Sequence, residues 1–256
     1  MNSTTVRSLL VRGMLAGLGA GVLALIVAYL MGEPHIDAAI AFEEAHSHEH
    51  GGAELVSRPM QSTAGLATGI LLYGVSLGGL AALGFCFALG RVGRFTPRAT
   101  AALLSAAALV AVYVVPFLKY PANPPSIGDP ETIGRRTTLY FLMMALSVLL
   151  AVGAVIVGKW LAPRLGNWYA TVAAVAGFAV AVALAYVFLP AINEVPEEFS
   201  ATLLWQFRLS ALAIQLTLWA GFGLLFGHLA ERVLAPKAAA AAGRATAPEA
   251  AAASAA

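Results

Sequence analysis

Cysteine and charge are both scarce in this chain of 256 residues. Its one cysteine, Cys86, excludes a disulfide framework and any zinc or iron–sulfur site built mainly from cysteine. Charged residues make up 11% of the chain, against about 25% in a typical soluble domain, which excludes an ordinary cytosolic enzyme. The net charge of +2 offers no basic face for phosphates, so we expect no nucleic-acid partner.

Apolar residues instead make up 60% of the chain and gather in long runs. A helix needs ~20 such residues to cross the hydrocarbon core of a bilayer, and the alternating pattern of barrel strands is absent. We therefore predict an all-α polytopic membrane protein, a bundle of about six transmembrane helices in contact with membrane lipids. The predicted spans lie near residues 13–31, 66–89, 99–118, 139–157, 169–189 and 209–229.

These spans form one predicted transmembrane domain over residues 1–234, followed by an alanine-rich tail, 235–256, that we expect to be disordered. The first span follows two arginines as a signal peptide does, but no A-x-A-like cleavage site ends it, so we expect it to be retained. Lysine and arginine concentrate in the segments on the side of the termini, which predicts that both termini are cytoplasmic.

With that orientation the longer connections, 32–65, 119–138 and 190–208, lie outside and carry most of the acidic residues. Because loops hold functional residues more often than the elements they join, we expect the outer face to be the working one.

Glycines four residues apart recur in several spans, as in Gly13-x3-Gly17-x3-Gly21 and Gly74-x3-Gly78. In lipid, such positions allow two helix backbones to approach closely. We expect them to serve packing within the bundle; the alternative is a contact face between copies in a homo-oligomer.

The outer segment 32–65 holds three histidines in five residues, His46, His48 and His50, just after Glu43 and Glu44. Two or three imidazoles with a carboxylate suit cobalt, nickel, zinc or copper. We interpret this His-rich loop as a collector that concentrates metal ions; the alternative is a solvated polar turn.

His35 follows the first span and has Glu33 and Asp37 beside it, so it is a further candidate metal ligand. The alternative is an interfacial histidine that is hydrogen-bonded to water or to the backbone.

The second outer connection is rich in proline, with four in the ten residues Pro121–Pro130, which stiffens it. A stiff loop over the end of a bundle can hold polar groups at the mouth of a pathway. Asp129 before Pro130 also has the pattern of a helix N-cap, which explains this residue without a substrate. The candidates for the mouth are Lys119, Tyr120, Asn123, Asp129, Arg135 and Arg136.

Arg208 and Gln215 lie seven residues apart in the last span and therefore share a helix face. Polar groups within a span usually face the interior of the bundle. They form either a polar track that descends from the mouth, or a snorkelling arginine and an interhelical hydrogen bond.

These segments carry a family resemblance. The stretch 119–125 (KYPANPP), the stretch 129–137 (DPETIGRRT) and the pattern W-x-F-R-x-S at 205–210, with Gln215, resemble the CbtA family of cobalt transporters over about residues 5–234. The resemblance implies uptake of divalent cobalt (or nickel) as substrate across the bacterial inner membrane, in support of cobalamin synthesis. It also implies a small single-span partner, CbtB.

Two functional hypotheses follow. The first is a permease for divalent metal ions without a tightly bound cofactor, and the second is a membrane scaffold or metal-sensing subunit that holds a partner. A membrane enzyme ranks last because no nucleophile–base pair appears in a span, and no P-loop for ATP is present.

Overall fold

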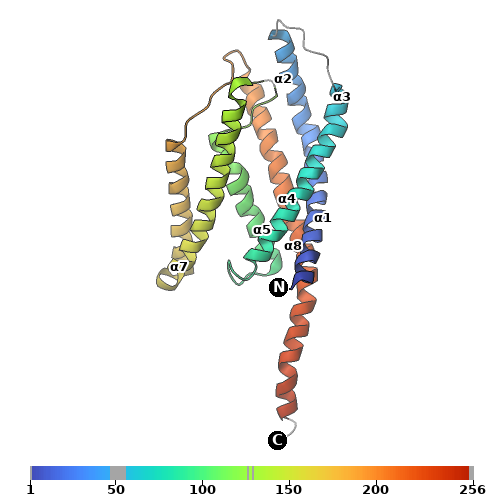
Figure 1. Cartoon of the computed structure of the whole chain (residues 1–256), viewed down its shortest axis with the longest axis vertical. Coiled ribbons are helices and arrows are strands. Elements are labelled where there is room, and N and C mark those ends of the chain that lie inside the picture. The colour runs from blue at the N-terminus through green and yellow to red at the C-terminus, as the bar shows by residue number, and fades with distance from the viewer. Residues whose placement is uncertain (1, 47–55, 126, 129, 254–256) are drawn as a thin grey trace. The chain divides into compact units, whose positions relative to one another are not determined.

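The computed structural model describes residues 2–46, 56–125, 127–128 and 130–253, with side chains described except at 46, 130 and 236–253. All regular structure within these residues is helical (Figure 1), which confirms the predicted all-α fold. The helical segments are α1 (Ser3–Val27), η1 (Ala28–Gly32), α2 (Glu33–His46), α3 (Arg58–Met60), η2 (Gln61–Gly65), α4 (Leu66–Ala88), α5 (Pro97–Ala108), η3 (Leu109–Val114), α6 (Val115–Lys119), η4 (Pro130–Thr132), α7 (Ile133–Phe188) and α8 (Ala201–Ala253).

Five helical stretches in the described residues are long and apolar enough to span a membrane. One of them, α7, has 56 residues, although ~20 suffice for a crossing. Gly166, at φ 75° and ψ 159°, interrupts its helical geometry, and the second arm returns alongside the first (Figure 1). The arms approach closely at Gly158, where an added Cβ would lie 3.2 Å from the Cβ of Ala174, and both arms contribute to one buried cluster through Met143 and Val182. Helix α7 is therefore a hairpin that contains the fourth and fifth predicted spans, so five helices carry six apolar stretches.

In two of the long helices a π-helical turn precedes a proline, and the helix continues past it. The π-helical turn η1 joins α1 to α2 and precedes Pro34 by two residues, and η3 joins α5 to α6 and precedes Pro116 by two residues. Proline lacks the N–H that would close an ordinary helical turn, and a wider π turn accommodates that loss. Each helix can thus continue to the level of the predicted outer segments.

The sequence predicts a loop over residues 32–65, but much of its described part is helical in the structure. Residues 33–46 continue the first helix as α2, and helix resumes at Arg58 with α3 and η2. The acidic side chains of α2 suggest a loop, but its other face is apolar and packs as a helix. Ala39 is fully buried with Phe199 and Ile127, and Phe42 packs edge-on against the ring of Phe199.

The chain divides into two compact units, of which the first comprises Met1–Val22, Ile70–Ser105 and Ala220–Ala256. Within it, α1 and α4 cross at glycines. A Cβ on Gly17 would lie 2.1 Å from the carbonyl oxygen of Gly74, and a Cβ on Gly78 would lie 2.3 Å from that of Gly13. The predicted packing role of these glycines is therefore confirmed, since only hydrogen fits between the two backbones.

We predict that Gly17→Ala destabilises the protein strongly, because the new methyl group overlaps the backbone of α4 and no side chain can move aside. Overpacking of this kind typically lowers the free energy of unfolding by about 1–3 kcal/mol. The matched control is Gly69→Ala on α4, where a Cβ meets nothing within 4 Å. Thermal unfolding in detergent, followed by size-exclusion chromatography, should separate the two variants. Equal stability of the two would contradict this helix crossing.

The second unit comprises Leu23–Gly69 and Ala106–Trp219. One of its buried clusters contains Val115, Tyr120, Met143 and Val182, and joins α6 to both arms of α7. The described candidate residues of the sequence analysis all belong to this unit.

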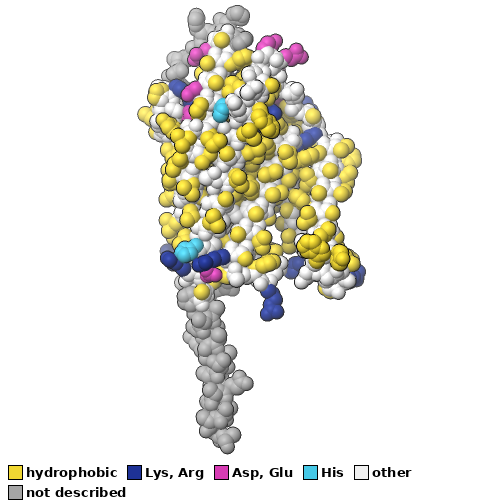
Figure 2. Space-filling model, turned by 180° about the vertical axis from the view of Figure 1, so that it is seen from behind, with side chains coloured by type: hydrophobic (Ala, Val, Ile, Leu, Met, Phe, Trp, Pro, Cys, Tyr) yellow, Lys and Arg dark blue, Asp and Glu magenta, His cyan; other side chains and the backbone are white. Residues whose placement is uncertain are grey.

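Apolar side chains cover most of the face in view in Figure 2, and charged side chains are few on it. Only 11% of the most apolar 18-residue stretch of α7 is buried inside the protein. Such surfaces suit contact with lipid tails. Helix α8 includes the alanine-rich segment up to Ala253, as the high helix propensity of alanine favours; the disorder of this tail stays a prediction.

Candidate functional site

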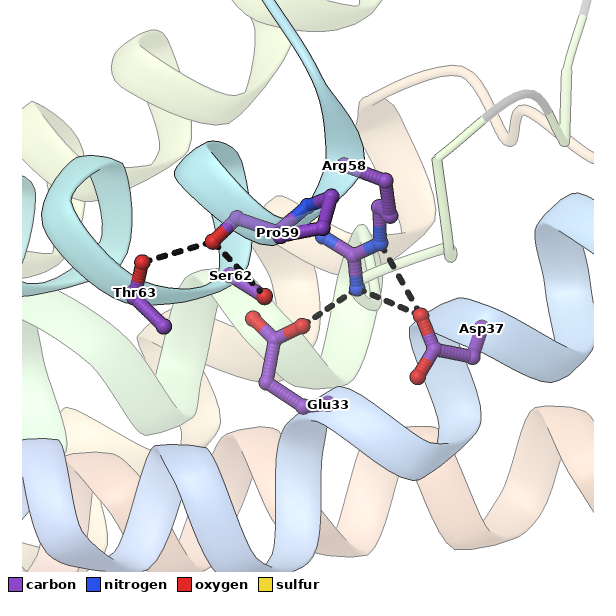
Figure 3. A network of polar contacts seen from close by, with 6 residues as sticks. All are labelled: Glu33, Asp37, Arg58, Pro59, Ser62 and Thr63. Atoms are coloured by element: carbon purple, nitrogen blue, oxygen red, sulfur yellow. Dashed lines mark hydrogen bonds and ion pairs between the residues drawn. The ribbon is translucent and has the colours of Figure 1, made fainter.

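An arginine at the start of the second long helix binds two carboxylates of α2 (Figure 3). The guanidinium of Arg58 pairs with Glu33, and its Nε and Nη2 lie 2.9 and 2.8 Å from Oδ1 of Asp37. The Glu33 side chain is 9% exposed, so this ion pair is largely shielded from solvent. The sequence analysis placed both acids beside a candidate metal ligand but gave Arg58 no role. The structure shows that these carboxylates already have a cationic partner.

His35 contacts the helix that precedes it and also α8. Its Nδ1 lies 2.6 Å from the carbonyl oxygen of Met31, and Ser210 Oγ lies 2.9 Å from the same oxygen and 3.3 Å from Nδ1. Because a carbonyl oxygen only accepts, Nδ1 carries the proton in this contact. A neutral His35 ring then keeps the lone pair on Nε2, which is the arrangement found in metal-ligating histidines. Metal binding by His35 stays a prediction.

A second set of polar side chains in this unit lines a cavity of about 380 Å³. Its walls come from η3 and α6, from the proline-rich loop, from the first arm of α7, from residues 192–195 and from α8. Four sequence candidates line it: Tyr120, Asn123, Arg136 and Arg208. The structure therefore brings together candidates from three separate segments of the chain.

Arg208 spans from α8 to the proline-rich loop. Its Nε donates to the carbonyl oxygen of Ala122 at 3.2 Å, and its Nη2 donates to Oδ1 of Asn123 at 3.1 Å. No carboxylate among the described residues forms an ion pair with this guanidinium. In the described part of the chain, its charge is therefore solvated by neutral acceptors and is not offset by a carboxylate.

Arg136 is paired, in contrast, with Glu194. Its Nη1 lies 3.0 Å from Oε2 of Glu194, whose other oxygen accepts a hydrogen bond from the Thr132 hydroxyl. The Glu194 side chain is 8% exposed. A Cβ on Gly128, which has a φ of 134°, would lie 2.9 Å from Nη1 of Arg136 and 3.0 Å from Oε2 of Glu194. The loop thus needs glycine here for two reasons, its backbone angle and the adjacent ion pair.

Tyr120 and Lys119 each donate a hydrogen bond to a backbone carbonyl oxygen near the C-terminal end of α7. The Tyr120 hydroxyl donates to the carbonyl oxygen of Pro190 at 2.9 Å, and burial raises the pKa of Tyr120, an effect that the charge of Arg135 partly opposes. The Lys119 ammonium donates to the carbonyl oxygen of Tyr186 at 2.8 Å and does not line the cavity. Tyr120 therefore stays protonated as a donor at neutral pH.

The remaining candidates lie elsewhere. Arg135 is exposed and outside the cavity lining, and Glu43 and Glu44 are exposed near the end of α2. Oε1 of Gln215 is buried and has no hydrogen-bond partner in the described part of the chain. The His46 side chain, His48, His50 and Asp129 lie outside the described residues. No group of three His, Cys, Asp or Glu that suits a metal ion occurs among the residues that the structure describes.

Sequence reasoning missed Glu194 and Gly128. Glu194 was one of many outer acids, and nothing in the sequence relates it to Arg136, which lies 58 residues away. Gly128 offered a better signal, since a glycine beside four prolines often marks a position with positive φ.

We predict that Gly128→Ala lowers the thermal stability and loosens the cavity, because the methyl group strains the backbone and collides with the ion pair of Arg136 and Glu194. Gly134→Ala is the matched control: this glycine lies in the first turns of α7 with nothing within 4 Å of a Cβ, and alanine there should stabilise by about 0.4–1 kcal/mol. Thermal unfolding checks both variants. A Gly128→Ala variant as stable as Gly134→Ala would contradict the geometry of this loop.

Together, the apolar helices and the polar cavity define a class: an all-α membrane protein with several spans. The family model of CbtA, described as "Probable cobalt transporter subunit", matches residues 6–231, and the chain belongs to this family. No curated protein and no solved structure matches the chain.

Proposed function

We propose that this chain is the multi-pass subunit of a system that takes up cobalt across the bacterial inner membrane, in support of cobalamin synthesis. The observation that carries the proposal is the match to the cobalt transporter family over residues 6–231, most of the chain. In this proposal the chain is a transporter subunit and not an enzyme, and cobalt is its cargo.

The charge distribution supports an orientation with both termini in the cytoplasm. Ten of the fifteen lysines and arginines then lie in inner segments, as the positive-inside rule requires. The cavity and the His-rich loop lie on the outer side in this orientation. Metal ions would reach the protein there first.

The pathway that we propose runs from the cavity along α8. Gln215 lies seven residues from Arg208 and so about 10 Å further along the same face of the helix. Its buried Oε1 has no partner in the described residues, and an unsatisfied oxygen within a span is a coordinating group for a passing cation or its water.

The metal ligands that we propose are histidines. His46, His48 and His50 collect ions in the outer loop, and His35, whose Nδ1 contacts the carbonyl oxygen of Met31, offers its Nε2 near the end of the first span. Imidazole nitrogen binds cobalt, nickel and zinc, so these residues do not by themselves select cobalt.

The word "subunit" in the family description implies a partner. We propose a small single-span protein of the CbtB type, with the apolar surfaces of the helices available for it. If this chain only holds such a partner, it is a scaffold, and the transport experiment below separates the two roles.

We predict that Gln215→Leu abolishes saturable cobalt uptake without loss of protein. Leucine has a similar volume, and the buried Oε1 of Gln215 has no hydrogen-bond partner among the described residues, so the variant should fold as well as the parent chain. The measurement is uptake of radiolabelled cobalt in bacteria that lack their own cobalt and nickel importers, with and without the small partner. Gln206→Leu, an exposed glutamine on the same helix, is the matched control.

Normal uptake per assembled complex in Gln215→Leu would contradict the pathway along α8. No uptake above background by the parent chain with its partner, at confirmed membrane expression, would contradict the permease and favour the scaffold.

We predict that replacing His46, His48 and His50 by alanine reduces uptake several-fold at trace cobalt and leaves the rate at saturating cobalt nearly unchanged. A collector raises the local concentration of the ion, which matters only when the pathway is unsaturated. The measurement is the concentration dependence of initial uptake rates. Equal loss at all concentrations would make the loop part of the pathway instead.

A further inference from the structure

The described charges of the cavity wall do not form a binding site for a bare divalent cation. Among the described residues, two arginines and one carboxylate face the cavity, Arg208, Arg136 and Glu194, which gives a net charge of +1 (two positive minus one negative). The carboxylate is already paired with Arg136 and accepts a further hydrogen bond from Thr132. A metal cation that enters between these groups is repelled by Arg208, and the described part of the wall offers no unpaired carboxylate to offset the repulsion.

Arg208 has donors to spare. A guanidinium carries five N–H groups, and the two contacts to Ala122 and Asn123 use two of them. The other three have no acceptor among the described residues. Their fork geometry matches the two oxygens of a carboxylate, and arginine is the side chain that binds such groups through paired hydrogen bonds.

The rest of the wall suits an organic anion. Tyr113, Phe117, Tyr140 and Phe141 supply apolar and aromatic surface around the polar groups. The volume of about 380 Å³ lies within the range of sites for small molecules, and is many times that of a water molecule. Apolar walls with a few polar groups at one side are typical of sites that orient a small organic ligand.

We propose that this cavity binds a small polycarboxylate, with one carboxylate held by Arg208. The carboxylate comes either from the free acid or from its complex with cobalt, in which the acid offsets the positive charge of the metal. The first source does not depend on the proposed function; the second deepens it, since cobalt then enters the mouth as a chelate.

The test is binding of citrate, cobalt citrate and cobalt alone to the purified full chain in neutral detergent, measured by isothermal titration calorimetry. We expect citrate or cobalt citrate to bind saturably, and the uncharged triethyl ester not to bind. Arg208→Gln should weaken binding at least tenfold, because the buried contact to the anion is lost. Arg91→Gln, an exposed arginine on a different element, should bind as the parent chain does.

A second pair of variants leaves Arg208 and its contacts in place. Thr137 lines the cavity and is exposed, so Thr137→Glu introduces a negative charge there without burying it in the core. Its neighbour Thr138 is also exposed but does not line the cavity, so Thr138→Glu is the control that adds the same charge outside it; this control loses the hydrogen bond from the Thr138 hydroxyl to the carbonyl oxygen of Gly134. We expect only Thr137→Glu to weaken binding of the anion.

Preference for cobalt citrate over citrate would identify the chelate as the source, and equal or stronger binding of citrate would identify the free acid; both support the site. Binding of cobalt alone but of neither citrate species would overturn the proposal, as would citrate binding that Arg208→Gln and Thr137→Glu leave unchanged. Uptake of cobalt chloride measured in cells remains a separate result, so failure of this site does not remove the transport function.

Discussion

The structure depends on one constraint: a backbone N–H or C=O placed in lipid needs a hydrogen-bond partner within the protein. Long helices meet it directly, and the π turns before Pro34 and Pro116 let two of them continue where proline removes a donor. The irregular segments of the second unit meet it differently. Carbonyl oxygens of Tyr186, Pro190 and Ala122, which lie at or near the ends of helices, accept hydrogen bonds from the side chains of Lys119, Tyr120 and Arg208.

This use of side chains explains why the polar candidates cluster. Lysine, tyrosine and arginine at the ends of α6 and near the start of α8 stabilise the loops between the helices, and those loops in turn form the cavity wall. Arg208 serves both purposes, because two of its donors fix the proline-rich loop and the rest remain for a ligand. A residue that supports the backbone of a loop is held in place by it, which makes the cavity preorganised for binding.

Much of the fold could be predicted from the sequence, because runs of ~20 apolar residues leave few alternatives in a bilayer. The two arms of the α7 hairpin could also be predicted, as two separate spans, although the chain turns between them at Gly166 without a distinct loop. The helical character of residues 33–46 was not accessible, since it depends on burial of Ala39 against Phe199, 160 positions away. The cavity was predicted in part: Arg208 and Asn123 were candidates, but Glu194 becomes meaningful only when folding places it beside Arg136.

The pairing of charges bears on how a cation passes through such a protein. The least exposed carboxylates of the described second unit, Glu33 and Glu194, are each bound to an arginine, so they stabilise structure and do not remain as vacant metal ligands. In the proposed function, capture of a metal ion then falls to histidine nitrogens or to oxygen ligands that the metal brings with it. The histidines proposed as ligands suit the former, and the Arg208 guanidinium, which has no ion-pair partner among the described residues, suits the latter. Under the two proposals together, the protein concentrates a divalent metal ion at its surface and still presents a positive cavity to the ion's anionic complex.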